Sequence, residues 1–99
     1  MPESNDLIHQ PLRLKIMAAL NGLASRESVE FSRLRSIVGA TDGNLGAHLA
    51  TLEQAGYVNI EKLFVDNKPR TRVSMTREGR KALVQHVAYL RDVLDGIVS

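Results

Sequence analysis

Basic side chains gather in one stretch of this 99-residue chain. Residues 62–81 hold seven lysines and arginines and two acidic residues, a local charge of +5, whereas the whole chain carries +2. A cluster of this kind is a footprint for a polyanion, because ammonium and guanidinium groups donate hydrogen bonds to phosphate oxygens. The alternative is that it is simply a solvated face.

A second candidate surface lies in residues 41–55, whose pattern predicts a helix. Residues on a helix advance by about 100° each, so Leu45, Leu49 and Leu52 cluster and mark the buried side. The outward side is small and uncharged. A helix with such a side can enter a DNA major groove, where an asparagine amide pairs bidentately with adenine. That side holds Gly43, Ala47, Ala50, Thr51 and Gln54, with Asn44 and His48 on the flank nearest Thr51.

Two glycines within this helix need an explanation. Gly43 and Gly46 each lower helix stability by about 0.8 to 1.0 kcal/mol relative to alanine. Close approach of the helix to a ligand would explain them. The alternative is that they let another helix pack close and that Asn44 is a local capping residue.

The remaining chemistry-bearing residues do not form a catalytic set. The chain has no cysteine, and its three histidines, His9, His48 and His86, lie far apart without a paired nucleophile. We therefore expect no enzymatic activity and no cofactor. A metal site formed by His86 with Asp92 and Asp95 is a weak alternative, since we expect His86 to be an exposed helix residue.

The elements that position these residues follow from periodicity. A helix is predicted over 11–22, a small edge strand over 28–31, and a helix over 32–38 that Ser32 caps and that buries Leu34, Ile37 and Val38. Gly39 ends that helix, and Thr41 caps the next one. Two short helices joined by a tight turn indicate a helix-turn-helix. The pattern leaves open whether residues 6–9 form one helical turn or an extended arm.

A hairpin and a long helix complete the chain. Val58, Ile60 and Phe64 fall on one face of a strand within 57–65, and we expect Phe64 to be buried. Residues 66–69 have turn chemistry, and a returning strand over 70–75 turns Arg70 and Arg72 to solvent. A last helix, capped by Thr76, runs through residue 97. This order predicts an α+β, mostly α, winged helix-turn-helix. We divide it into an N-terminal arm (1–10), a DNA-binding core (11–76) and a C-terminal helix (77–99).

The last helix carries an apolar stripe with the 4-3 spacing of a heptad seam, which favours a homodimer. The alternative is that the stripe packs on the first helix of its own domain. The seam consists of Leu83, Val87, Leu90, Leu94 and Ile97.

Four stretches resemble the small single-domain winged-helix transcriptional regulators of bacteria and archaea, allied to the MarR and ArsR groups. They are HQPLRLKI at 9–16, TDGNL at 41–45 with HL at 48–49 and LEQAGYV at 52–58, KPRT at 68–71, and MTREGR at 75–80. The resemblance implies contacts to DNA from the 41–55 helix and from the basic hairpin. Two departures, Gly46 in place of a common serine and Ala50 with Thr51 in place of a common basic pair, remove phosphate contacts and predict modest affinity per monomer.

The sequence thus predicts a cytoplasmic, sequence-specific regulator that binds double-stranded DNA. We expect a homodimer that represses transcription from a palindromic operator, through recognition helix 41–55 and wing 62–73. The alternative is a winged helix that binds proteins and no specific DNA. No membrane contact is expected, and the sequence does not indicate a small-molecule effector. The expected DNA-contacting residues are Arg33, Arg35, Thr41, Asp42, Gly43, Asn44, Ala47, His48, Thr51, Lys62, Lys68, Arg70 and Arg72.

Overall fold

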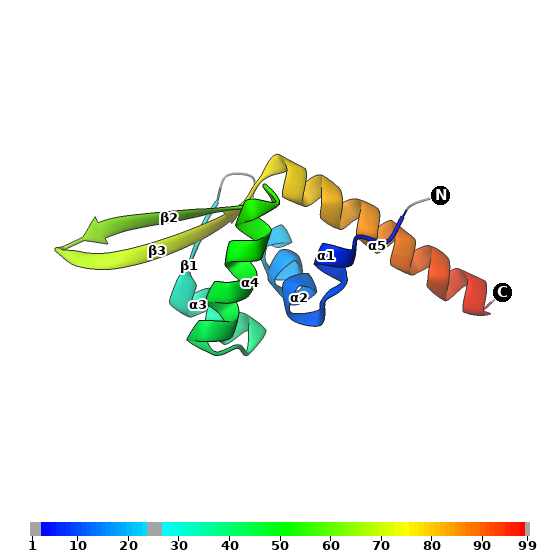
Figure 1. Ribbon diagram of the computed structural model, residues 1–99, viewed down its shortest axis with the longest axis horizontal. Helices are drawn as coiled ribbons and strands as arrows, with labels where there is room; N and C mark the ends of the chain where they lie inside the picture. The colour runs from blue at the N-terminus through cyan, green and yellow to red at the C-terminus, as the bar shows by residue number, and fades with distance from the viewer. Residues whose placement is uncertain (1–2, 24–26, 99) are drawn as a thin grey trace.

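A computed structural model of the chain describes residues 3–23 and 27–98 (Figure 1). Five helices and three strands occur in these residues, and their arrangement confirms the predicted α+β, mostly α, winged-helix fold. In chain order the elements are α1 (Asp6–His9), α2 (Pro11–Asn21), β1 (Val29–Glu30), α3 (Phe31–Val38), α4 (Asp42–Gln54), β2 (Val58–Val65), β3 (Lys68–Met75) and α5 (Arg77–Val98).

The strands form one antiparallel sheet in the order β1-β3-β2. The predicted edge strand is confirmed, because Val29 of β1 pairs with Val73 of β3. The hairpin turn is shorter than predicted: only Asp66 and Asn67 connect β2 to β3, and both have positive φ values of 53° and 62°. Two positive-φ residues define the turn type that matches the twist of paired strands. Asparagine and aspartate tolerate this conformation, so the turn needs only these two residues. The returning strand β3 therefore begins directly after them, at Lys68.

The hydrophobic core lies between the helices and the inner face of this sheet. Leu45, Leu49 and Leu52 of α4 are buried, as the periodicity predicts. Residues 6–9 form one helical turn, whose Ile8 is completely buried in the same core, so this part of the expected arm packs on the domain. The other buried apolar residues are Ile16, Met17, Leu20, Val29, Leu34, Val38, Val58, Val73, Ala82 and Leu83.

The helix-turn-helix consists of α3 and α4. Gly39 adopts the left-handed conformation between them, with φ of 68°, as predicted for a residue that ends a helix. Two details of α3 were predicted wrongly. Its N-cap is Glu30, which makes no side-chain capping bond, instead of Ser32, and Ile37 is 56% exposed. Ile37 lies about 100° around the helix from the buried Val38, which turns it out of the core.

The wing (β2 and β3) and α5 project from opposite sides of the domain, which is 57 Å in its longest dimension (Figure 1). The first turn of α5 packs tightly against the base of the wing, since a Cβ on Gly79 would lie 2.1 Å from the Tyr57 carbonyl oxygen. Thr76 caps this turn as predicted, because its Oγ1 accepts a hydrogen bond from the Gly79 amide at 2.9 Å. Within the described residues, we find no helix whose length and apolar character would suit it to cross a bilayer.

Candidate nucleic-acid interface

The outward surface of α4 is open. Gly43, Asn44 and Ala47 are exposed, and His48 and Thr51 are half-buried on the adjoining flank. A Cβ added to Gly43 or Gly46 would meet no described atom within 4 Å, so close packing within the domain does not account for either glycine. This finding removes the alternative that the glycines admit another helix of the described domain. The surface can therefore approach an external partner at the level of its backbone.

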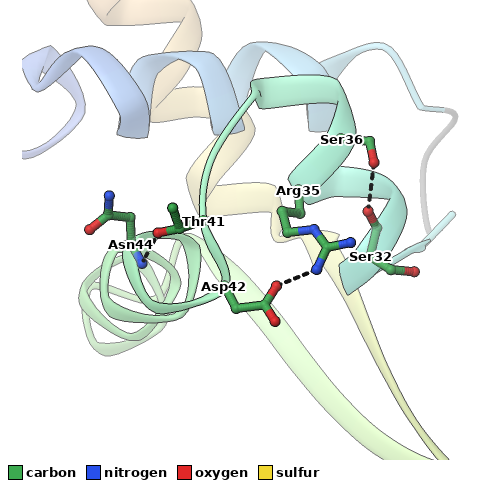
Figure 2. A network of polar contacts seen from close by, with 6 residues as sticks. All are labelled: Ser32, Arg35, Ser36, Thr41, Asp42 and Asn44. Carbon is green, nitrogen blue, oxygen red and sulfur yellow. Dashed lines mark hydrogen bonds and ion pairs between the residues drawn. The ribbon is translucent and has the colours of Figure 1, made fainter.

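The N-terminus of α4 is capped by Thr41, which is exposed and whose Oγ1 accepts a hydrogen bond from the Asn44 amide N–H at 3.2 Å (Figure 2). Only the backbone N–H of Asn44 takes part in the capping bond. Its side-chain amide makes no hydrogen bond with any described residue. Figure 2 shows this side chain directed away from α3. The amide keeps both its donors and its acceptor available, and the capping alternative for Asn44 does not hold.

Two of the expected DNA contacts bond to each other. Arg35 Nη1 of α3 lies 2.5 Å from Asp42 Oδ1 at the start of α4 (Figure 2). Their side chains are 40% and 70% exposed, so the pair faces solvent beside the capped end of α4. The positive charge of Arg35 and the negative charge of Asp42 therefore offset each other at this end of α4. Arg33, the other expected cation of α3, is exposed.

Arg13 also lies beside α4, a contact that the sequence pattern did not predict. Arg13 of α2 donates from Nε to the Leu7 carbonyl oxygen at 2.5 Å, and its Nη1 lies 3.2 Å from His48 Nδ1. It brings a full positive charge to the flank of α4 that carries Asn44 and His48. Its place in the sequence could have indicated this contact. Arg13 lies in the first turn of a helix, where the helix dipole disfavours a cation, so its guanidinium needs hydrogen-bond partners elsewhere in the fold.

The basic residues of the wing are divided between its two faces. Arg70 and Arg72 lie on the outer face, as predicted, where both meet acidic neighbours. Arg70 Nη1 is 3.8 Å from Glu30 Oε2, and Arg72 pairs in register with Glu30 on one side and Glu61 on the other. Lys62 pairs with Thr71 on the inner face, and Lys68 is exposed next to the turn.

A cleft of about 620 Å³ separates the inner face of the wing from α4. Small residues of α4, Gly46 and Ala50, line one wall, and Ile60, Lys62 and Thr71 line the other. The inner face continues past this cleft to Phe64, which was predicted to be buried and is 77% exposed. The prediction was wrong because the strand runs beyond the part of the sheet that the helices cover.

The expected dimer seam on α5 divides along its length. Leu83 is only 3% exposed and belongs to the core of its own domain. It therefore offers almost no surface to a second copy of the chain. Val87 and Leu90 are half-buried, and Leu94 and Ile97 are 61% and 75% exposed. The first half of the apolar stripe packs on the domain. Its second half, with Leu94 and Ile97, extends beyond the domain and is exposed.

His86 is fully buried, although it was predicted to be exposed. Its Nδ1 accepts a hydrogen bond from the Asn5 amide at 3.1 Å, its Nε2 lies 3.3 Å from His9 Nδ1, and its ring stacks on Tyr89. Burial, followed by the charge of His9, lowers the pKa of His86. Asp92 and Asp95 instead line a groove with Asn21 and Val84, and no three metal-ligating side chains gather in the described part of the chain.

Comparison with known proteins identifies relatives of this chain. The family model described as a winged helix DNA-binding domain matches residues 12–94. An uncharacterized protein of Methanocaldococcus jannaschii is 35% identical over 81 residues, which are 82% of this chain and 85% of that protein. The structure of a transcriptional regulator homologue from Pyrococcus horikoshii is 33% identical, with a TM-score of 0.82 over 92% of this chain and 87% of that one. A MarR-family structure from Enterococcus faecalis shares the fold, with 24% identity and a TM-score of 0.70 over 93% and 79% of the two chains.

Proposed function

The chain belongs to the winged helix DNA-binding domain family and is a DNA-binding regulator, and from this premise we propose that it represses transcription by binding a palindromic operator as a homodimer. The single observation that carries the proposal is the surface of α4. That surface is exposed, free of bulky side chains, and holds an asparagine amide with no partner among the described residues.

We assign base reading to α4. The exposed amide of Asn44 can donate from Nδ2 to adenine N7 and accept at Oδ1 from the adenine N6 amino group, the bidentate pairing typical of asparagine. The neighbouring Ala47 and Gly43 leave room for the backbone to approach. Thr41, His48 and Thr51 border the same surface. These contacts give specificity, because base edges in the major groove differ in their donors and acceptors.

Phosphate contacts are assigned to the exposed cations on either side of α4. Lys68 next to the hairpin turn is the strongest candidate, since it is exposed and has no ion pair among the described residues. Arg70 and Arg72 face acidic side chains, which DNA phosphates would have to displace. The remaining phosphate contacts are assigned to Arg33 and Lys62.

The dimer rests on α5. Leu94 and Ile97 form an exposed apolar continuation of the stripe that packs on the core, and burial of apolar area stabilises by about 25 cal/mol per Å². A second copy related by a twofold axis would cover them. Such a dimer binds two half-sites about 34 to 36 Å apart or at a multiple of that spacing. Repression then follows when the bound dimer occupies a promoter.

The test is selection of an operator from random duplexes, followed by binding of two variants. Asn44→Ala is expected to weaken operator binding about 5-fold or more and to leave binding to random DNA unchanged, since it removes a base contact. Lys68→Ala is expected to weaken both and to lower the salt slope by about 0.9, since it removes a phosphate contact. Equal losses on all duplexes for both variants would contradict the assigned roles.

A further inference from the structure

We infer that Arg13 is a positioning residue that fixes the imidazole of His48 as a hydrogen-bond donor, so that the recognition helix reads a base with an acceptor edge, guanine above all. This inference rests on the proposed function. It adds a residue of α2 to the determinants of specificity and states which chemistry His48 offers to DNA.

The chemistry of the contact fixes the proton on His48. Arg13 Nη1 lies 3.2 Å from His48 Nδ1, within hydrogen-bond distance. A guanidinium has only donors, so the ring nitrogen that it meets must be the acceptor. In the neutral ring the proton then resides on Nε2. The other ring nitrogen is therefore a donor, and no described residue accepts from it.

Arg13 is held where it makes this contact. Its Nε donates to the Leu7 carbonyl oxygen at 2.5 Å, and its backbone N–H donates to Gln10 Oε1 at 2.8 Å. Leu7 belongs to α1, which is anchored by the completely buried Ile8. A guanidinium that a backbone carbonyl already holds at Nε can orient a ring more sharply than a free side chain, because the orientation is formed before DNA arrives.

The position of His48 defines what it can read. His48 follows Asn44 by one helical turn on the same flank of α4, about 6 Å along the helix. Successive base pairs are about 3.4 Å apart, so the two side chains address bases within about two steps of each other. Guanine offers two adjacent acceptors, N7 and O6, in the major groove, and adenine suits Asn44. We therefore expect an adenine and a guanine within two steps in each half-site.

The experiment is a double-mutant cycle on the selected operator and on a copy with 7-deazaguanine at the base assigned to His48. The variants are Arg13→Met, His48→Gln and the two together. A glutamine amide can donate from the place of the ring Nε2 without help from Arg13. Lys15→Met is the control, because Lys15 is an exposed cation of α2 and the change removes the same charge.

We expect the wild type to bind the 7-deazaguanine operator about 5-fold or more weakly than the natural one. Arg13→Met should lose this discrimination, whereas His48→Gln should keep it with or without Arg13. Lys15→Met should keep it as well. If Arg13→Met instead weakens binding to every duplex equally in both backgrounds and lowers the salt slope, Arg13 is a phosphate contact and the inference falls, while the proposed function stands.

A measurement without DNA separates failure of the inference from failure of the proposed function. Long-range proton–nitrogen NMR correlations of the free protein at pH 8 report which ring nitrogen carries the proton. The inference requires an unprotonated Nδ1 on His48 in the wild type and a loss of this single tautomer in Arg13→Met. A protonated Nδ1 in the wild type would overturn it, whatever the outcome of operator selection.

Discussion

Arg35 and Asp42 join the two helices of the helix-turn-helix by an ion pair of 2.5 Å across the turn that contains Gly39. Asp42 also lies in the first turn of α4, where its charge complements the helix dipole. The pair places the Asp42 carboxylate beside the surface proposed to meet DNA, where it offsets the charge of Arg35. It also engages Nη1 of the Arg35 guanidinium, which a DNA phosphate would otherwise be free to contact.

Asp42→Asn is therefore expected to strengthen binding to all duplexes. The change removes repulsion of phosphate and frees Arg35, which should make the salt slope steeper by about 0.9. Exposed ion pairs contribute about 0 to 1 kcal/mol, so the free energy of unfolding should fall by no more than about 1 kcal/mol. Fluorescence anisotropy over a salt series and urea unfolding measure the two effects. Weaker binding to random duplexes would show that Asp42 supports the DNA-bound form.

Gly43→Ala is expected to change stability and binding in opposite directions. A Cβ at this position meets no described atom within 4 Å, so alanine should raise the free energy of unfolding, by at most about 0.8 to 1.0 kcal/mol because Gly43 lies in the first turn of α4. The same methyl group would stand between α4 and the base edges and weaken operator binding. Gly96→Ala in α5 is the control, since its Cβ is equally open and it lies far from α4 in the chain. Unchanged operator binding by Gly43→Ala would mean that the backbone does not approach DNA there.

The burial of His86 predicts a loss of stability in mild acid. The pKa of this residue is lowered from its ordinary value of 6.5, chiefly by burial and then by the charge of His9. Below pH 6.5, His86 of the unfolded chain binds a proton, whereas the folded chain disfavours protonation of this residue. The free energy of unfolding therefore falls as the pH falls. The groups around the ring are His9 and Tyr89, and the Asn5 amide donates to it.

His86→Asn tests this origin, because an amide oxygen can accept from Asn5 and does not titrate. The difference in unfolding free energy between pH 7.5 and pH 5.5, measured in urea, should be smaller in His86→Asn than in the wild type. Gln85→Asn, at an exposed position of the same helix, is the control and should keep the wild-type difference. An unchanged difference in His86→Asn would assign the acid sensitivity to other groups.

Leu94→Glu is expected to dissociate the proposed dimer without unfolding the domain. Leu94 is 61% exposed, so a carboxylate there is hydrated in the monomer but would be buried against a second copy. Sedimentation equilibrium should show a monomer with an unchanged helical content by circular dichroism. Gln85→Glu adds the same charge at another exposed position of α5 and should remain dimeric. A wild type that sediments as a monomer would contradict the dimer directly.

Sequence periodicity predicted the elements well because each is fixed by local rules. The buried leucines of α4, the αL turn at Gly39 and the cap at Thr41 all follow from spacing within one helix or turn. The extent of the core was harder to predict. Ile37 and Phe64 have the pattern of buried residues but lie beyond the surfaces that neighbouring elements cover.

Contacts between distant segments could not be derived from local patterns. His86 is buried because Asn5, 81 residues earlier, folds back onto α5, and Arg13 reaches His48 across 35 residues. The Arg35–Asp42 pair depends on the angle between two helices. Each of these contacts changes the role that a residue was expected to have, which is why the candidate site was less predictable than the fold.

We expect this domain to bind double-stranded DNA through α4 and the wing. Fluorescence anisotropy of the purified protein on a random duplex, repeated at several salt concentrations, tests it most directly. We expect measurable binding at low salt, with log affinity falling linearly as log salt rises. A folded protein that binds no duplex at low salt would rule out DNA binding through this surface and favour a winged helix that binds proteins.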